Sequence, residues 1–494
     1  MVSSALLKSV LLTQLIQQAC ALLPISKDRF VESSDCYEVS EIVQAPVSFQ
    51  RYMSSKENVL VSKQQQVLTS NTTQTTNTQT ILNMIPGLSV LQSDANNECY
   101  YVDTIIGEKE YPLIIDTGSA YLWVYGDDCE DPACSNEALY TPTASSSASE
   151  TATSTFQLAY VTGTASGEIM SDNIIVNKMA TTQKFRFGMA NSVPDFFAQY
   201  PVSGIFGLPS NDSSSIESIV SALYDSHAIG VKRFSISMGQ INKDDTYLNN
   251  SGIFAVGDPV SELYTGDFHY TSLTSNADNY WLIELSAVYI DTFKLTFDTA
   301  QTIGSNTSYV ARSAIIDSGT TVLVLPKQDA LSVHSYFANS ITDGSNFAVL
   351  CNSTLDLSFE INGKNFTVTS EEYLGNAYAE DSGYYGYCVS NIQGVDSYAQ
   401  NSWILGAVFL KTSYLDFDIS EQRVGFATKN TNVYLTSTAT TTSAATATAS
   451  TTLTASVVTG STTASHTTYK DSGVAVGGAS LFSAFVSSIL LFLL

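Results

Sequence analysis

One short sequence design occurs twice in this chain, and its two copies stand 201 residues apart. Asp116-Thr117-Gly118 follows the apolar residues 113–115, and Asp317-Ser318-Gly319 follows the apolar residues 314–316. Each copy predicts a buried β-strand that ends at a carboxylate on a glycine-containing turn. A single Asp-Thr-Gly is common and usually marks only the end of a strand. Two copies in matching contexts indicate a duplicated strand and loop.

Further landmarks accompany these loops. Trp123 stands seven residues after Asp116. Residues 156–167 alternate apolar and polar positions and contain a Thr-Gly turn, which predicts a β-hairpin carrying Tyr160. Two apolar segments contain glycine, residues 204–208 and 403–406. A final pair of segments, residues 416–418 and 423–427, is strand-like.

With the two loops, these landmarks resemble the pepsin-like aspartic proteases, from about residue 100 to about residue 427. The resemblance implies an all-β, bilobal fold with the active-site cleft between two β-rich lobes, residues 86–270 and 271–434. It also implies that Asp116 and Asp317 are catalytic. Two carboxylates about 3 Å apart cannot both ionise cheaply and share one proton, so sequence leaves open which aspartate carries it.

The resemblance assigns roles to the residues around the pair. Gly118 and Gly319 permit tight turns near the carboxylates, and the hydroxyls of Thr117 and Ser318 are expected to hydrogen-bond across the two loops. Ser119 and Thr320 are each expected to donate to the neighbouring aspartate. Trp123 braces a flap in which Tyr160, Thr162 and Gly163 cover the substrate. Val161 stands where the family usually has glycine, which leaves flap mobility open.

Composition agrees with a β-rich body. The chain has 494 residues, 44% of them hydrophobic, with 27 Tyr and 23 Phe, and its ends are too polar or too biased to pack a core. Short alternating segments broken by Gly, Asn and Ser dominate the middle. Residues 214–223 and 327–337 are the better helix candidates.

The net charge of −26 disfavours nucleic acid as a partner, because phosphate binding needs a basic face. Self-repulsion is smallest near the sequence pI of about 4.3, which fits an acidic exterior. The four histidines show no metal spacing, no Gly-rich phosphate loop appears, and we expect neither metal nor cofactor. We expect a monomer that acts on polypeptides.

The N-terminal residues 1–21 fit a secretory signal, ending in Ala19-Cys20-Ala21. Residues 22–85 are polar and carry scattered lysines, which suits either a pro-segment of a zymogen or a plain linker. Removal of the signal leaves six of the seven cysteines, an even number that suits an oxidising compartment. The resemblance pairs Cys129 with Cys134 and Cys351 with Cys388. Cys36 and Cys99 remain, and a bridge between them would tie the pro-region to the first strand of the enzyme.

The C-terminal part is biased in composition. Residues 435–471 are mostly Ser, Thr, Ala and Val, typical of an O-glycosylated stalk. Residues 472–494 have the small residues, spacer and apolar end of a GPI-attachment signal, with Asp471, Ser472 and Gly473 as candidate attachment residues. A transmembrane helix over 474–494 is the alternative. Six Asn-x-Ser/Thr sequons, at positions 71, 211, 249, 306, 352 and 365, suit a secreted glycoprotein.

Two functions from different classes follow. The first is an acid endopeptidase attached to the cell membrane or wall by a GPI anchor, which resembles the fungal GPI-anchored (yapsin-like) aspartic proteases. The second is a surface protein of the same fold that binds or adheres without turnover. Asp127, Asp128, Glu130 and Asp131 form either an acidic pocket wall for basic substrate residues or a solvated acidic loop.

Overall fold

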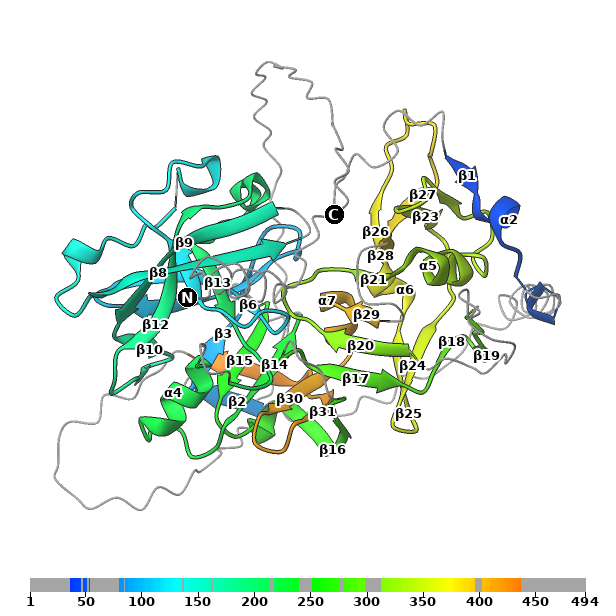
Figure 1. The fold of residues 1–494 in the computed structure, drawn as a ribbon. Coiled ribbons are helices and arrows are strands. Elements are labelled where there is room, and N and C mark those ends of the chain that lie inside the picture. The colour runs from blue at the N-terminus through cyan, green and yellow to red at the C-terminus, as the bar shows by residue number, and fades with distance from the viewer. Residues whose placement is uncertain are drawn as a thin grey trace, which may run out of the picture. The chain divides into compact units, whose positions relative to one another are not determined.

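The computed structural model describes residues 36–45, 48–50, 53, 80–83, 85–135, 137–160, 163–212, 217–239, 251–274, 279–297, 312–395 and 402–436. These ranges belong to one compact unit, residues 1–457. The expected signal peptide, most of the stalk and the GPI signal lie outside them. No helix in these ranges is long and apolar enough to cross a membrane. The strands dominate, as expected for an all-β fold (Figure 1).

The N-terminal lobe is built on a ten-stranded sheet in the order β11-β10-β5-β6-β13-β7-β12-β9-β8, with β4 beside β5 (Figure 1). Its strands are β4 (Gln92–Ser93), β5 (Tyr100–Ile106), β6 (Lys109–Asp116), β7 (Trp123–Tyr125), β8 (Ser149–Tyr160), β9 (Gly163–Asp172), β10 (Ile174–Val176), β11 (Met179–Ala180), β12 (Phe185–Ser192) and β13 (Gly204–Gly207). The last four residues of β6 are all buried, which explains why residues 113–115 before Asp116 are continuously apolar.

The C-terminal lobe contains three sheets, in the orders β17-β20-β29-β21-β28, β19-β18-β24-β25 and β1-β22-β23-β27-β26. Their strands are β1 (Tyr37–Glu38), β17 (Leu282–Leu285), β18 (Ala287–Ile290), β19 (Phe293–Lys294), β20 (Arg312–Ile316), β21 (Leu323–Pro326), β22 (Ile341–Thr342), β23 (Phe347–Leu350), β24 (Leu357–Ile361), β25 (Lys364–Val368), β26 (Leu374–Ala377), β27 (Tyr387–Ser390), β28 (Ile392–Val395) and β29 (Ser402–Leu405).

A six-stranded sheet, β16-β31-β30-β14-β15-β3, joins strands from both halves of the chain. Its members are β3 (Leu88–Val90), β14 (Arg233–Met238), β15 (Gly252–Val256), β16 (Tyr264–Ser272), β30 (Tyr414–Asp418) and β31 (Arg423–Lys429). A separate parallel pair joins β2 (Thr80–Asn83) to β32 (Val433–Thr436). The strand-like segments expected at residues 416–418 and 423–427 therefore lie within β30 and β31.

The described helices are short: α2 (Val39–Ile42), α4 (Ile219–Asp225), α5 (Lys327–His334), α6 (Ser370–Tyr373) and α7 (Ala407–Leu410). The sequence predicted α5 and α4. Ser218 caps α4 by accepting a hydrogen bond from the Ser221 backbone N–H at 3.1 Å, so this helix begins later than expected.

The two lobes repeat one arrangement of three strands. In the N-terminal lobe β13 runs parallel to β6, with Gly207 opposite Asp116, and antiparallel to β7. In the C-terminal lobe β29 runs parallel to β20, with Leu405 opposite Ile316, and antiparallel to β21. The two Asp-containing loops therefore leave equivalent positions of equivalent sheets.

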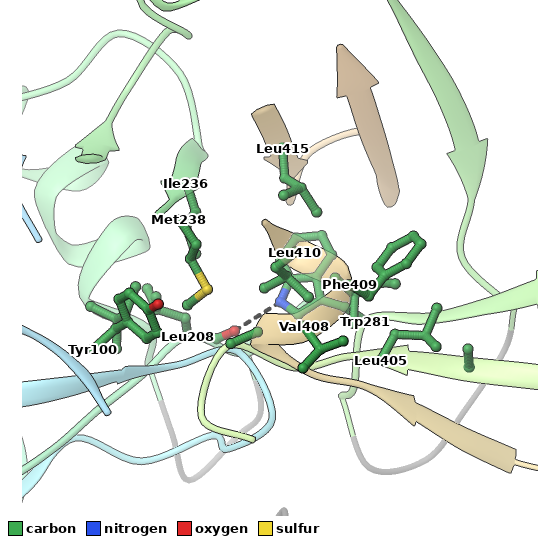
Figure 2. Packing of buried hydrophobic residues seen from close by; sticks show 14 of the residues in the cluster. Tyr100, Leu208, Ile236, Met238, Trp281, Leu405, Val408, Phe409, Leu410 and Leu415 are labelled. Atoms are coloured by element: carbon green, nitrogen blue, oxygen red, sulfur yellow. Dashed lines mark hydrogen bonds between the residues drawn. The ribbon is translucent and has the colours of Figure 1, made fainter. Parts of the chain in front are cut away.

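The apolar-glycine segments lie directly against the chain that follows the two Asp-containing loops. A Cβ at Gly207 would stand 2.4 Å from the Tyr121 carbonyl oxygen, and a Cβ at Gly406 would stand 2.4 Å from that of Thr320. Only glycine allows backbones to approach this closely. Leu208, Met238 and Leu410 belong to one hydrophobic core, and Figure 2 shows part of it.

Candidate active site

The two Asp-containing loops hold each other through reciprocal hydrogen bonds. The Thr117 hydroxyl donates to the Ile316 carbonyl at 2.7 Å and accepts from the Ser318 backbone N–H at 2.9 Å. The Ser318 hydroxyl donates to the Ile115 carbonyl at 2.8 Å and accepts from the Thr117 N–H at 2.9 Å. All four bonds are buried, where such bonds are strong and costly to leave unmade. The predicted exchange of hydroxyls across the loops is confirmed.

Asp116 and Asp317 lie at the centre of this network and are buried. The Gly118 N–H donates to Asp116 Oδ1 at 2.8 Å, and the Gly319 N–H donates to Asp317 Oδ1 at 2.9 Å. Each turn therefore directs one backbone dipole at its own carboxylate, which restrains the orientation of both side chains.

Gly319 also brings the two loops into contact. A Cβ on this residue would stand 2.4 Å from Asp116 Oδ1 and 2.6 Å from the Asp116 carboxyl carbon. No side chain fits at that separation. The glycine of the second loop is therefore required by the carboxylate of the first, a reason that the sequence pattern alone did not supply.

The hydroxyl residues after the two tripeptides behave differently. The Thr320 hydroxyl donates to Asp317 Oδ2 at 2.6 Å, as predicted. The matching bond from Ser119 to Asp116 does not form with acceptable geometry: among the described residues, Ser119 Oγ and Asp116 Oδ2 are buried without a hydrogen-bond partner. A buried carboxylate oxygen that the protein leaves unsatisfied is one that a bound molecule can engage.

The surroundings of Asp116 shift the pKa of its carboxyl group. Burial, followed by the charge of Asp317, raises the pKa of Asp116 well above its ordinary value. The nearby Ser119 hydroxyl and the Gly118 N–H act against this rise. A carboxyl with a raised pKa keeps its proton in mildly acidic solution, so Asp116 can hold a proton there.

The expected flap is a β-hairpin of β8 and β9, with Tyr160 paired to Gly163 at its described end. Phe156, Leu158 and Tyr160 are buried on one face, which confirms the alternation predicted for this segment. The Trp123 indole N–H donates to the Tyr160 hydroxyl at 2.8 Å, as expected of a bracing residue. Val161 and Thr162 lie outside the described residues.

An aromatic cluster supports this hairpin from the N-terminal lobe. The Phe197 ring meets the rings of Trp123 and Tyr160 edge-on, with centroids 5.5 and 6.1 Å away. Pro194 lies against Gly163 and would meet a Cβ there at 3.0 Å. Phe197 and Pro194 belong to one short segment, so this segment positions the flap. The sequence analysis did not identify it.

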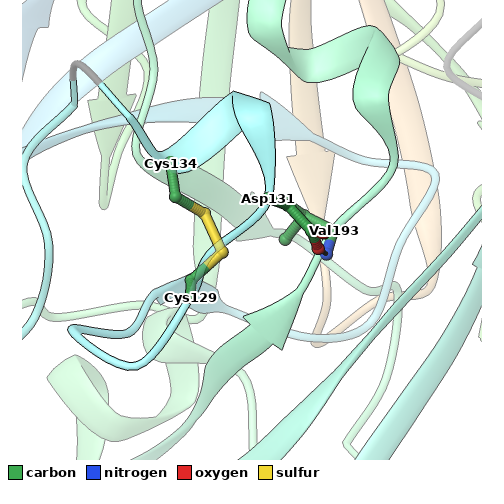
Figure 3. The surroundings of a disulfide bond; sticks show 4 residues. All are labelled: Cys129, Asp131, Cys134 and Val193. Atoms are coloured by element: carbon green, nitrogen blue, oxygen red, sulfur yellow. Dashed lines mark hydrogen bonds between the residues drawn. A yellow bond between two sulfur atoms is a disulfide. The ribbon is translucent and has the colours of Figure 1, made fainter.

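The small disulfide loop is joined to that segment. Cys129 and Cys134 form the expected bridge, and Asp131 Oδ2 within the loop accepts the Val193 N–H at 2.7 Å (Figure 3). Asp127, Asp128 and Glu130 are exposed. Asp131 thus anchors the backbone before Pro194, whereas its three acidic neighbours face solvent.

The remaining cysteines divide into a bridge and two free thiols. Cys351 and Cys388 form the second expected disulfide. The weak expectation of a bridge between Cys36 and Cys99 is wrong, because both are free. Cys99 is buried in the N-terminal lobe, whereas Cys36 packs against Ile341 and Ala348 of the C-terminal lobe.

Trp281 is a residue near the site that sequence reasoning missed. Its indole N–H donates to the Leu208 carbonyl at 2.8 Å (Figure 2), and its own carbonyl accepts the Ile316 N–H at 3.0 Å. The Leu208 N–H in turn donates to the Asp116 carbonyl at 2.8 Å. Trp281 therefore connects the strand that precedes Asp317 with Leu208, whose backbone is bonded to Asp116. No local sequence pattern around Trp281 predicts such a role.

A buried ion pair beside β20 was also missed. Arg312, five residues before Asp317, contacts Asp329 of α5 through two hydrogen bonds of 2.6 and 2.8 Å. The Trp403 indole N–H donates to the same carboxylate at 2.8 Å. The three residues join α5 to β20, the strand that leads into the second Asp-containing loop, and to its neighbour β29.

Other features of the described chain bear on the predictions. No group of three His, Cys, Asp or Glu gathers as metal ligands within the described ranges.

A hollow of about 880 Å³ is lined by Leu88, Val90 and Ile105 and does not include the aspartates, so size alone does not identify the site. Asn211, Asn352 and Asn365 are exposed, and the other three sequon asparagines lie outside the described residues.

Comparison with known proteins places this geometry in context. A family model described as eukaryotic aspartyl protease matches residues 99–429. The aspartic-type endopeptidase ctsD of Aspergillus fumigatus is 30% identical over 412 residues, which cover 81% of this chain and 78% of that protein. Pepsin A of Callithrix jacchus is 29% identical over 332 residues, which cover 65% and 77%.

A second fungal relative is matched over a smaller share of its length. The probable aspartic-type endopeptidase CTSD of Arthroderma benhamiae is 26% identical over 347 residues, which cover 70% of this chain and 64% of that protein. The chain therefore spans slightly less than two thirds of this relative.

Proposed function

The chain belongs to the eukaryotic aspartyl protease family and is an aspartic endopeptidase, and on this premise we propose that Asp116 and Asp317 are its catalytic pair. The observation that carries this proposal is the buried, reciprocal hydrogen bonding of Thr117 and Ser318, which holds the two carboxylates in one site. The loss of either aspartate or its glycine would favour a binding protein without turnover, and this chain retains all four residues.

In the proposed mechanism the two aspartates act on one water molecule. The ionised carboxylate takes a proton from the water, which attacks the carbonyl carbon of the scissile peptide bond. The protonated carboxyl hydrogen-bonds the carbonyl oxygen as it gains charge in the tetrahedral intermediate. The raised pKa of Asp116 supports this residue as the one that starts with the proton. Tyr160 and Gly163 of the flap would cover the bound polypeptide.

Replacement of each aspartate tests this assignment. Asp116→Asn and Asp317→Asn should each abolish cleavage of a denatured protein at about pH 4, because one proton and one charge are both needed. The fold should survive, since asparagine has the same shape. Asp128→Asn, at an exposed site in the same lobe, is the matched control and should cleave normally. Turnover by either catalytic variant within about tenfold of the parent would contradict the proposal.

The pH profile provides a second test of the same pair. Because the pair must stay singly ionised, the rate should be bell-shaped with its optimum in acid. The raised pKa of Asp116 should extend the active range toward higher pH, since on the alkaline side of the optimum activity falls when this residue loses its proton. A flat profile from about pH 3 to about pH 8 would contradict the mechanism.

We further propose that the enzyme is made as a secreted zymogen and displayed at the cell surface. The support comes from sequence: a signal-like N-terminus, a polar segment over 22–85, a Ser/Thr-rich stalk over 435–471 and a GPI-like signal over 472–494. The two disulfides and three exposed sequon asparagines suit an oxidising, extracellular setting.

Phosphatidylinositol-specific phospholipase tests the anchor. The enzyme should be released from membranes by this treatment, and deletion of the residues after Gly473 should send it into the medium. Mass spectrometry of the released form should identify Asp471, Ser472 or Gly473 as the attachment residue. Resistance to the phospholipase together with retention of Leu494 would instead establish a transmembrane segment.

A further inference from the structure

The segment 36–53, which precedes the protease body in sequence, docks on the C-terminal lobe. Its β1 pairs antiparallel with β22 and so becomes the outer strand of the sheet β1-β22-β23-β27-β26 (Figure 1). Tyr37 lies opposite Thr342, and Glu38 lies opposite Ile341. The backbone N–H of Val39 continues the attachment by donating to the Ser340 carbonyl at 2.9 Å.

Two side chains of the segment enter the core of that lobe. Val39 is fully buried, and Phe49 is 2% exposed. The Phe49 ring meets Phe293 of β19 and Tyr336 edge-on, with centroids 5.1 and 4.7 Å away. Burial of two such side chains, added to strand pairing, is the combination by which folded proteins capture extended peptides.

The partly buried residues of the segment extend this contact. Ala45 and Met53 pack against the same large core, and Cys36 packs against Ile341 and Ala348. Removal of the segment would expose these apolar surfaces and leave β22 as an unpaired sheet edge. Such edges promote aggregation, so proteins normally cover them.

The chain on the other side of residues 54–79 is also anchored in the body. Thr80 begins β2, which pairs with β32, and β3 pairs with β15 of the six-stranded sheet. A cut between Met53 and Thr80 would therefore leave an attached strand on each side.

We propose that residues 36–53 are a permanent part of the C-terminal lobe and stay bound after the chain is cut between Met53 and Thr80, so that the mature enzyme consists of two chains. The surface formed by β22, Phe293 and Tyr336 is then a peptide-binding surface whose occupant is this segment. The inference rests on the proposed removal of a pro-segment, because an uncut chain would hold the segment covalently.

The test separates retention from catalysis. A recognition sequence for a site-specific protease is inserted between Gln64 and Gln65 of the full chain, in an Asp116→Asn background that cannot process itself. After the cut, native gel filtration followed by denaturing mass spectrometry shows where the N-terminal fragment elutes. We expect it to elute with the body in an equimolar amount and to separate only in denaturant.

Val39→Asp and Ile42→Asp form a matched pair for this test. Both change an aliphatic residue of α2 to aspartate, but Val39 is fully buried and Ile42 is 48% exposed. Val39→Asp should release the fragment at least about tenfold faster, because it buries an unpaired charge, and Ile42→Asp should retain it. Phe49→Leu, a milder change, should give an intermediate rate if Val39→Asp does not fold.

Two outcomes would overturn the proposal. One is separation of the fragment from the parent body during native gel filtration. The other is equal retention by the Val39→Asp and Ile42→Asp variants. The test needs no turnover, so a failure of retention is distinguishable from a failure of the proposed catalytic pair. As a second measurement, active enzyme matured without the inserted site should also contain the fragment.

Discussion

The two halves of the active site share a backbone plan but use different chemistry to support it. Five residues before its aspartate, the N-terminal lobe has the aromatic Tyr111, and the C-terminal lobe has the charged Arg312. Tyr111 packs beside the Tyr140 ring, with centroids 6.2 Å apart, whereas Arg312 is held by Asp329. Seven residues after its aspartate, one lobe has Trp123 and the other has Val324.

The aromatic supports of one lobe and the polar supports of the other respond differently to small movements. The aromatic supports of the N-terminal lobe continue into the flap, since Trp123 hydrogen-bonds Tyr160. The C-terminal lobe has buried polar supports: the ion pair, the Thr320 hydroxyl on Asp317, and His334 of α5. Apolar packing tolerates small shifts of its members, whereas a buried charge loses much of its stabilisation when its partner moves. We infer that the C-terminal half is the more rigid half of the site.

The largest effect is expected from breaking the ion pair. Arg312→Met should lower the free energy of unfolding by about 3–5 kcal/mol, because it leaves the Asp329 carboxylate buried without its cation. Tyr111→Phe, at the matching position, should cost less than about 1 kcal/mol, since its hydroxyl reaches the Leu139 carbonyl only at 3.5 Å. Denaturant unfolding of both variants measures the contrast. Equal losses would show that the two lobes are supported alike.

Acid should weaken the C-terminal lobe through His334. This buried side chain stacks on Phe347 with ring centroids 3.9 Å apart, and burial lowers its pKa from 6.5 to about 3. Folded His334 therefore stays neutral at a pH where the unfolded chain binds a proton. Its stabilising effect is complete above about pH 6.5 and is lost as the pH falls toward about 3, by about 3 kcal/mol at pH 4.

The variant His334→Phe tests this linkage. It should flatten the fall of unfolding free energy with pH by about one proton between pH 6.5 and pH 3, whatever its effect at neutral pH. His227→Asn, at an exposed position with φ of 57°, is the control and should keep the wild-type slope. An unchanged slope in His334→Phe would show that this residue does not set the acid limit of the lobe.

Contact between the loops should be broken by Gly319→Ala. The added Cβ would displace the Asp116 carboxylate, and a displacement near 1 Å costs about a hundredfold in rate, or about 2.7 kcal/mol. The loss should appear in kcat, and the overpacked site should also lower the free energy of unfolding by about 1–3 kcal/mol. Gly230→Ala, where an added Cβ meets nothing within 4 Å, should have wild-type activity. Full activity of Gly319→Ala would mean that the loops are not held as closely as described.

The smallest expected effects on activity concern Ser119 and Thr320, the hydroxyl residues that follow the two Asp-containing tripeptides. Thr320→Val removes the hydrogen bond to Asp317 and should lower kcat/KM about tenfold, because a bond to a charged group is lost. Ser119→Ala removes a hydroxyl that lies near the Asp116 carboxylate without meeting the geometry of a hydrogen bond, and it should change kcat/KM less than about threefold. A larger loss of kcat/KM in Ser119→Ala than in Thr320→Val would show that the supporting hydroxyl belongs to the N-terminal loop.

The sequence by itself determined the parts of the molecule that local pattern encodes. Repetition of apolar residues followed by Asp-Thr-Gly or Asp-Ser-Gly predicted both catalytic strands and loops, and alternation predicted the β8–β9 hairpin. The resemblance to a family then supplied both disulfides and the hydroxyl exchange of Thr117 with Ser318. These features succeed because the neighbours in sequence set the conformation of a strand or turn.

Only the tertiary structure decided which side chains meet across long stretches of chain. Asp329 and Trp403 are 74 residues apart, and neither local sequence predicts the hydrogen bond between them. Ser119 and Thr320 look equivalent in sequence, yet only the threonine meets the geometry of a bond to its carboxylate. The docking of residues 36–53 is likewise set by a distant sheet edge. Hydrogen bonds and close packing depend on tenths of an ångström, and that precision arises only when the whole chain is assembled.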